Sequence, residues 1–184
     1  MKFPILATSL LVAATLAGCA SRSDNAVRVE PTYQEAAANA FLSTNQEAAL
    51  KLIAGYQTDA FKNSPLLVAT IVDVNDTRVS APLGRTLSEQ YASTLANAGL
   101  NVHEIKLRGN VFVQEGTGEL LLSREIQDIA KSQNAGVVLV GTYSAAARFT
   151  YVSLKLVRTE DSRIVSAYDY SLPNNRDVRR LLQK

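Results

Sequence analysis

Two continuous apolar segments constrain the fold of this 184-residue chain more than any other feature. They are LLVATIV at residues 66–72 and VVLVGTY at residues 137–143. Both are rich in β-branched residues and lack the alternation of a strand with one solvated face, a pattern typical of strands buried on both faces. We therefore expect two buried strands here, the first of them central in a sheet.

Two amphipathic helices are predicted next to these strands. In the first helix, large apolar residues recur every four positions: Leu83, Leu87, Tyr91 and Leu95. Ser80 is a favourable N-cap for it, Pro82 stands in its first turn, and Gly99 supplies the C-terminal stop. Ser123 can cap the second helix, which turns three apolar residues inward: Ile126, Ile129 and Ala130.

The remaining segments complete the predicted fold class. A short strand is expected at 102–107, and alternating apolar positions predict two more at 149–157 and 164–172. Near the N-terminus a helix is expected over 33–42, with a break at Ser43 and a new start at Thr44, whose spacing to Glu47 has the form of a capping box. The sequence thus predicts an α+β fold, with helices packed on one face of a mixed β-sheet that ends in a C-terminal antiparallel meander.

The first eighteen residues have the layout of a secretory signal, with one lysine, a short apolar stretch and small residues at its end. Residues 16–19, LAGC, resemble the lipobox of bacterial lipoproteins. That resemblance implies that Cys19, the only cysteine, carries the lipid and becomes the first residue of the mature chain. An ordinary signal peptide with an incidental cysteine is the alternative. Ala20 in place of an aspartate implies, by the same resemblance, an outer-membrane destination.

Composition divides the chain into five expected parts. They are a lipoprotein signal peptide (1–18), a lipidated N-terminus and flexible tether (19–31), an N-terminal helical segment (32–57), an α+β domain (58–173) and a basic C-terminal tail (174–184). A formal net charge of +2 gives no support for nucleic-acid binding, which needs a concentrated basic surface. A single cysteine cannot form a disulfide within the chain, so a hydrophobic core must hold the fold.

Candidates for catalysis or ligand binding are few. His103, the only histidine, lies in the expected strand 102–107, and the chain has no GxSxG motif, so we expect a structural histidine at a strand edge. The GTG at 116–118 lacks the further residues of a dinucleotide loop or a P-loop and is expected to be a turn. Residues 73–77, DVNDT, begin like a calcium loop, but Arg78 replaces the necessary glycine. We assign no catalytic residue, cofactor or metal site and predict a protein that is not an enzyme.

Two segments allow two interpretations each. The C-terminal tail carries four basic residues, Arg176, Arg179, Arg180 and Lys184. It is expected to be a solvated tail, with a docking patch for an acidic partner or a lipid head group as the alternative. Residues 111–113, VFV, are either an additional short strand tucked under the sheet or an exposed anchor for a partner.

Four stretches, at residues 64–72, 82–90, 118–125 and 140–143, resemble in their order and spacing the FlgO family of flagellar outer-membrane lipoproteins. This resemblance implies that residues 58–173 form a FlgO-like domain facing the periplasm or the cell surface. It also implies a noncatalytic role in flagellum stability, assembly and motility through contacts with basal-body or other envelope proteins, with homo-oligomers left open.

Two other functions stay open at this point. The domain is also similar to the N-terminal domain of TolB and to the activator lipoproteins of penicillin-binding proteins, so a periplasmic activator or scaffold for a cell-wall synthase is the alternative. An envelope hydrolase that uses His103 is a third hypothesis.

Overall fold

The computed structural model describes residues 30–54, 56, 64–78, 80–105, 112–114 and 120–183. The chain forms two compact units, residues 1–37 and 38–184. The described part of the first unit contains α1 (Tyr33–Ala37). Thr32 begins this helix, because its Oγ1 accepts a hydrogen bond from the Glu35 N–H at 3.2 Å while Glu35 Oε2 accepts one from the Thr32 N–H at 2.8 Å. This reciprocal pair is a capping box.

The second unit combines helices with a six-stranded sheet and a separate two-stranded sheet. Its elements in chain order are α2 (Ala40–Ala54), β1 (Leu66–Ala69), β2 (Val72–Asp73), α3 (Pro82–Asn97), β3 (Val102–Ile105), β4 (Phe112–Gln114), β5 (Leu120–Leu122), α4 (Arg124–Ser132), β6 (Val137–Ala145), β7 (Phe149–Arg158), β8 (Ile164–Pro173) and α5 (Arg176–Leu181).

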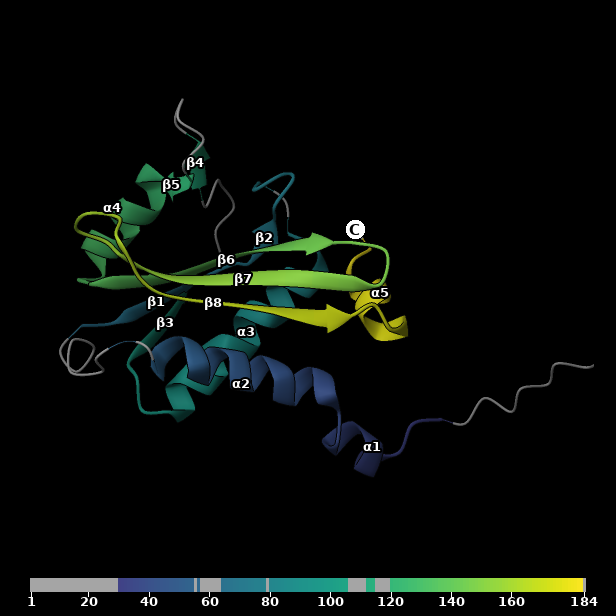
Figure 1. Ribbon diagram of the computed structural model, residues 1–184. Helices are drawn as coiled ribbons and strands as arrows, with labels where there is room; N and C mark the ends of the chain where they lie inside the picture. The colour runs from purple at the N-terminus through teal and green to yellow at the C-terminus, as the bar shows by residue number, and fades with distance from the viewer. Residues whose placement is uncertain are drawn as a thin grey trace, which may run out of the picture. The chain divides into compact units, whose positions relative to one another are not determined.

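The strand order of the main sheet is β3-β1-β6-β7-β8, and β2 also pairs with β6 (Figure 1). Strand β1 is parallel to β3 and β6, whereas β6, β7 and β8 are successively antiparallel. The predicted α+β class, the mixed sheet and the C-terminal meander are confirmed. All four residues of β1 are buried, as expected for a central strand, but the apolar segment 66–72 is interrupted between β1 and β2.

Two hydrophobic clusters cover the two faces of the sheet. Leu66 and Val68 of β1 pack with α2 and α3, while Leu67 and Ala69 pack with Ile126 of α4. In Figure 1, α4 lies above the sheet and α2 and α3 lie below it. The expectation of helices on one face therefore holds for α2 and α3 and is corrected for α4.

The handedness of the strand connections explains the position of α4. From β1 the chain crosses through α3 to β3 on one side, and from β3 it crosses back through α4 to β6 on the other side of β1. Connections between parallel strands are almost always right-handed. Because the two crossovers run in opposite directions across the sheet, their helices must lie on opposite faces.

Two expected helix starts are corrected by hydrogen bonds. Helix α2 begins after Asn39, whose Oδ1 accepts from the Phe41 N–H at 2.8 Å, so the expected break at Ser43 and start at Thr44 are wrong. Ala81 takes the N-cap position of α3 without a side-chain cap bond, because Ser80 Oγ instead donates to the Ile71 carbonyl at 2.8 Å. Asparagine is as good a helix cap as serine, so either residue type can mark a start.

Other predicted helix boundaries are confirmed. Ser123 Oγ caps α4 by accepting from the Ile126 N–H at 3.3 Å, and Gly99 follows α3 with a φ of 89°. A positive φ of this size favours glycine because other residues are strained there.

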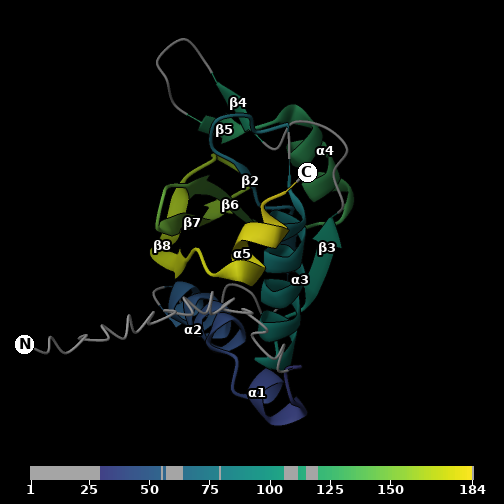
Figure 2. The ribbon, with the colours of Figure 1, turned by 90° about the vertical axis from the view of Figure 1, so that its right-hand side faces the viewer.

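The C-terminal segment is not a solvated tail. It forms α5, capped by Asn175 Oδ1, which accepts from the Val178 N–H at 2.9 Å. Val178 is 1% exposed and belongs to the core cluster under α2 and α3. Figure 2 shows α5 at the end of the sheet, beside α3. The arginines of α5 are exposed, while Val178 is buried and Leu181 is partly buried, so the basic composition alone does not predict the docked helix.

For the segment VFV, a short strand is confirmed over β4, although Val111 lies outside the described residues. It does not join the main sheet: β4 pairs antiparallel with β5, with Phe112 opposite Leu122 and Gln114 opposite Leu120.

Candidate interaction surface

The predicted lipidation site is outside the part of the chain that the structure describes. Cys19, the signal segment 1–18, the tether up to residue 29 and the GTG at 116–118 all lie there, so these predictions stay as they were. None of the described helices has the length and apolarity that crossing a membrane requires. Among the described residues, no three His, Cys, Asp or Glu side chains are grouped so that they could hold a metal ion.

His103 lies on β3, one of the two edge strands of the main sheet, opposite Leu67 of β1. Its side chain is exposed, so the expected position at a strand edge is confirmed. Glu104 does not form a site with His103. It is the next residue along the strand, so its side chain points to the opposite face of the sheet.

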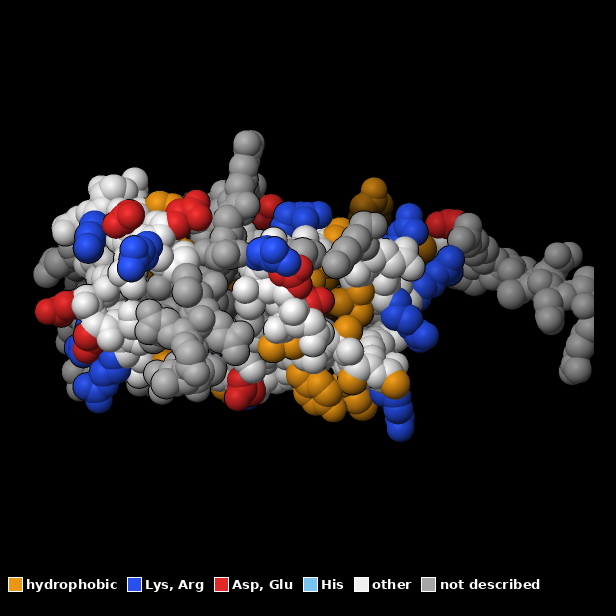
Figure 3. Space-filling model, turned by 90° about the horizontal axis from the view of Figure 1, so that it is seen from above, with side chains coloured by type: hydrophobic (Ala, Val, Ile, Leu, Met, Phe, Trp, Pro, Cys, Tyr) orange, Lys and Arg blue, Asp and Glu red, His pale blue; other side chains and the backbone are white. Residues whose placement is uncertain are grey.

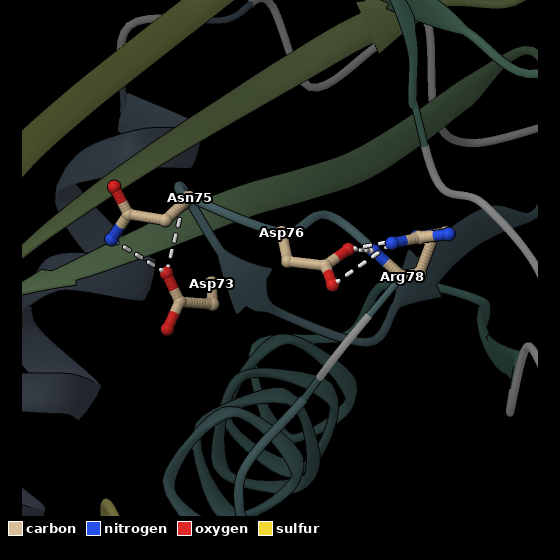
Figure 4. Close-up of polar contacts among 4 residues, drawn as sticks. All are labelled: Asp73, Asn75, Asp76 and Arg78. Carbon is tan, nitrogen blue, oxygen red and sulfur yellow. Dashed lines mark hydrogen bonds and ion pairs between the residues drawn. The ribbon is translucent and has the colours of Figure 1, made fainter.

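The loop after β2 uses its carboxylates within the loop itself (Figure 4). Asp73 Oδ1 accepts from the backbone N–H of Asn75 at 2.9 Å and from its side-chain amide at 3.1 Å. Asp76 Oδ1 accepts from the backbone N–H of Arg78 at 3.2 Å and from its guanidinium at 2.9 Å. Arg78, which stands where a calcium loop has glycine, therefore pairs with the Asp76 carboxylate, and its side chain is exposed on the surface.

The backbone that leads into this loop is bonded to α3 and to the residues just before it. The backbone N–H and carbonyl of Ile71, between β1 and β2, bond to Ser88 Oγ at 3.0 Å and Ser80 Oγ at 2.8 Å. Tyr143 OH of β6 accepts from the Ala81 N–H at 3.0 Å, and burial raises the pKa of the Tyr143 phenol. A Cβ on Gly84 would lie 2.0 Å from the Ile71 carbonyl oxygen, so α3 packs directly on the backbone between β1 and β2. These contacts fix the backbone between β1 and β2 against α3, the residues before it, and β6.

A buried polar network joins α2 to α3 and β8. Asn45, fully buried in α2, donates to Gln90 Oε1 at 2.7 Å and accepts from Tyr170 OH at 2.6 Å. Tyr170 OH also shares a hydrogen bond with Tyr91 OH. Burial raises the pKa of both phenols, so they are neutral at physiological pH and serve as hydrogen-bonding groups.

Sequence reasoning missed this network. Its one signal is a polar residue, Asn45, at the helical spacing of the buried face that also holds Ala48, Ala49 and Leu52. A buried polar group without a partner is costly, so its presence on that face indicates a specific hydrogen bond. The partner could not be read, because Tyr170 is 125 residues away.

The face of the meander opposite α2 is open at the end nearest α5. Phe149 is 39% exposed and Tyr151 is 55% exposed, two residues apart on β7, whereas Val152 and Leu154 face the core. Arg148 precedes them, and its guanidinium lies 5.9 Å from the centroid of the Phe149 ring. With the arginines of α5, these residues place aromatic and cationic side chains at one end of the molecule.

The polar groups of the described interior are committed to the fold, and one end of the surface is basic and aromatic. The described buried polar side chains bond to one another or to the backbone, and none is left without a partner. The exposed features are a long antiparallel edge strand, β8, and a basic and aromatic end. The described part of the chain is therefore an α+β domain whose buried polar groups serve the fold, and its basic and aromatic end is the candidate interaction surface.

Comparison with known proteins gives the family. The family model described as FlgO protein matches residues 46–177, more than half of the chain. The chain belongs to the FlgO family, and the resemblance found in its four sequence stretches is confirmed. No curated protein matches this chain.

Several solved structures are similar in fold. The LpoB C-terminal domain from Escherichia coli is 14% identical, with 73% of this chain and 98% of that chain covered and a TM-score of 0.50. The LpoB C-terminal domain from Salmonella enterica is 17% identical, with 69% and 93% covered and a TM-score of 0.47. The PelC dodecamer from Paraburkholderia phytofirmans is 17% identical, with 60% and 71% covered and a TM-score of 0.42. At such identities the likeness to the Escherichia coli domain shows a shared fold and does not transfer a function.

Proposed function

We propose that this chain is a noncatalytic outer-membrane lipoprotein that supports flagellum assembly or stability, and hence motility, through protein contacts. The observation that carries the proposal is membership of the FlgO family over residues 46–177. Cys19 is its lipid attachment point, and the domain faces the periplasm or the cell surface. Basal-body or other envelope proteins are its partners.

The interior of the domain supports a contact function. Its buried polar groups are committed to the fold: Asn45 to Tyr170, and Ser88 to the Ile71 backbone. An enzyme needs a nucleophile or a general base that can reach a substrate, and such groups have perturbed pKa values in clefts. The two phenols whose pKa burial raises strongly, Tyr91 and Tyr170, bond to each other in the core.

The anchor is tested by replacing the thiol. Cys19→Ser should abolish incorporation of labelled palmitate and release the protein from the outer-membrane fraction, because two or more acyl chains are needed for stable attachment. Ser21→Ala, two residues away in the same segment, should change neither result. Continued outer-membrane fractionation of Cys19→Ser without palmitate would contradict the anchoring part of the proposal.

The flagellar role is tested separately in a flagellated host. Deleting the gene should reduce swimming and the number of attached filaments, and wild-type protein should restore both. Cys19→Ser should fail to restore them, whereas Ser21→Ala should succeed. Normal swimming and normal filament number after deletion would remove the flagellar part and leave the anchoring part standing.

A periplasmic activator or scaffold for a cell-wall synthase is the second candidate. This candidate is retained because the chain shares a fold with the LpoB C-terminal domain from Escherichia coli. A tether of about a dozen residues, 20–31, reaches only roughly 40 Å when fully extended, which disfavours a long reach across the periplasm. Crosslinking the lipidated protein in intact cells distinguishes the two: basal-body proteins among the products support the first candidate, and cell-wall synthases the second.

A further inference from the structure

Four arginines of the described chain lie at one end of the molecule (Figure 3). We define the basic tip as Arg148, Arg176, Arg179 and Arg180 together with the exposed aromatic residues Phe149 and Tyr151. Asp177 is the acidic residue among them. In Figure 3, Lys and Arg side chains gather at the right-hand end, where α5 lies, and hydrophobic side chains are exposed next to them. The chain as a whole has a formal charge of only +2, so this end differs strongly from the rest.

The basic tip is built from two distant segments that are braced together. Asn174 donates from its backbone N–H to the Arg148 carbonyl at 2.9 Å and from its side-chain amide to the Ala146 carbonyl at 2.6 Å. Its Oδ1 accepts from the buried Thr150 hydroxyl at 2.7 Å. The turn before β7 is thereby fixed against the start of α5, and Val178 fixes α5 to the core. The arginines and aromatic rings therefore project from two segments that hydrogen bonds and core packing hold together.

We propose that the basic tip binds the surface of an anionic phospholipid bilayer. Arginine side chains attract anionic head groups, and exposed aromatic rings lie favourably at the boundary between head groups and acyl chains. A protein partner would instead be expected to fill an apolar pocket with an anchor residue. The hollow at this end is lined by polar and charged side chains alone: Arg176, Asp177, Arg179, Arg180 and Gln183.

This inference deepens the proposed function but does not need it. A domain tethered to a membrane through Cys19 stays within reach of the head groups, and the basic tip would then set which end of the domain lies on the membrane. Binding of the unlipidated chain to vesicles tests the tip alone. Failure of the lipid anchor and failure of the tip are therefore distinguishable.

The experiment uses the chain from residue 20 onward, which retains the whole compact unit 38–184. It is sedimented with vesicles of phosphatidylcholine alone or of equal parts phosphatidylcholine and phosphatidylglycerol. We expect binding to the mixed vesicles and little binding to phosphatidylcholine. Each arginine at a membrane surface contributes about fivefold to affinity, so the triple variant Arg176→Gln, Arg179→Gln, Arg180→Gln should bind about a hundredfold more weakly.

The matched control removes the same charge from the opposite end. Arg124→Gln and Lys131→Gln on α4, with Arg163→Gln in the turn before β8, change exposed residues far from α5 (Figure 1). This variant should keep at least most of the wild-type binding. Tyr151→Ser should weaken binding by several-fold without changing its dependence on phosphatidylglycerol.

Three results would overturn the proposal. One is equal binding of the wild-type chain to both vesicle types, and another is an equal loss in the two charge variants, which would indicate nonspecific attraction. The third is no binding of the wild-type chain to either vesicle type. If crosslinking in cells then joins the wild-type chain, but not the triple Gln variant, to an acidic protein, the tip binds a protein partner instead.

Discussion

Tyr170 of β8 donates a hydrogen bond at 2.6 Å to the side-chain oxygen of Asn45 in α2, across 125 residues of sequence. The same phenol bonds to Tyr91 of α3, and Asn45 also donates to Gln90 of α3. These contacts join the N-terminal helical segment, the longest helix and the edge strand in one buried network. The helix α2 is thus an integral part of the domain, and the following predictions test that network and the packing around it.

Removing the Tyr170 hydroxyl should destabilise the fold. Tyr170→Phe leaves the oxygen of Asn45, which is fully buried, without its donor. We expect the free energy of unfolding to fall by about 1–3 kcal/mol, measured by urea denaturation. Tyr151→Phe removes a hydroxyl from a ring that is 55% exposed and should stay within about 0.5 kcal/mol of wild type. Similar losses in both variants would show that the network contributes nothing specific.

Alkaline pH should destabilise the protein through the paired phenols. Burial raises the pKa of Tyr91 and of Tyr170 in the folded state, so above about pH 10 the unfolded chain releases these protons first. The free energy of unfolding should then fall by about 1.4 kcal/mol per pH unit for each phenol. Urea denaturation from pH 8 to 12 should show a shallower decline in the double variant Tyr91→Phe, Tyr170→Phe. Parallel curves would rule out the phenols as the cause.

Adding a methyl group at Gly84 should be strongly destabilising. Its Cβ would lie 2.0 Å from the Ile71 carbonyl oxygen, a backbone atom that cannot rotate away. Although alanine is the better helix former, we expect Gly84→Ala to lower the free energy of unfolding by about 3 kcal/mol because α3 must move from the sheet. Ser93→Ala, exposed on the same helix, should change it by less than about 0.5 kcal/mol. A neutral Gly84→Ala would contradict the close approach of α3 to the strand.

In the turn between β7 and β8, we expect the Asp161 carboxyl to titrate below its ordinary pKa. The Arg158 guanidinium bonds to Asp161 through Nε at 2.8 Å and through Nη2, and these bonds lower the pKa of the Asp161 carboxyl to about 2. Because this folded-state pKa lies below the ordinary 3.8, any stability from the pair is present above about pH 4 and is lost as the pH falls toward 2. Titration by NMR should show Arg158→Gln raising the pKa toward 3.8, whereas Arg163→Gln should leave it low because the Arg163 contact is a backbone one.

Helix α5 should contribute to stability through one side chain. Val178→Ala removes two methyl groups from a side chain that is 1% exposed and should lower the free energy of unfolding by about 2 kcal/mol. The next residue offers the control, since Arg179→Ala changes an exposed side chain and should have little effect on unfolding. If Val178→Ala unfolds at the wild-type urea concentration, α5 is not docked on the core in solution.

Local patterns were sufficient for most elements but failed at two helix starts and did not indicate β5 or α5. Thr44 and Glu47 match a capping box, yet Glu47 instead pairs with Lys51 at 2.7 Å inside α2. The capping box that forms is the one between Thr32 and Glu35. The predicted N-cap role of Ser80 is wrong for a different reason. Its hydroxyl donates to the Ile71 carbonyl, a partner that is near only once α3 has packed on the sheet.

The sequence alone determined where the apolar segments of the main sheet lie, that the strand beginning at Leu66 is central, and which family the chain resembles, because these follow from the side chains of neighbouring residues. It indicated neither the break between β1 and β2 nor the short strand β5. Only the tertiary structure decided that α4 covers the opposite face, because right-handed crossovers constrain helices only after the strand order is set. It also decided that Asn45 meets Tyr170 and that Arg148 joins the arginines of α5, since these pairs are far apart in the chain and meet only in the folded domain.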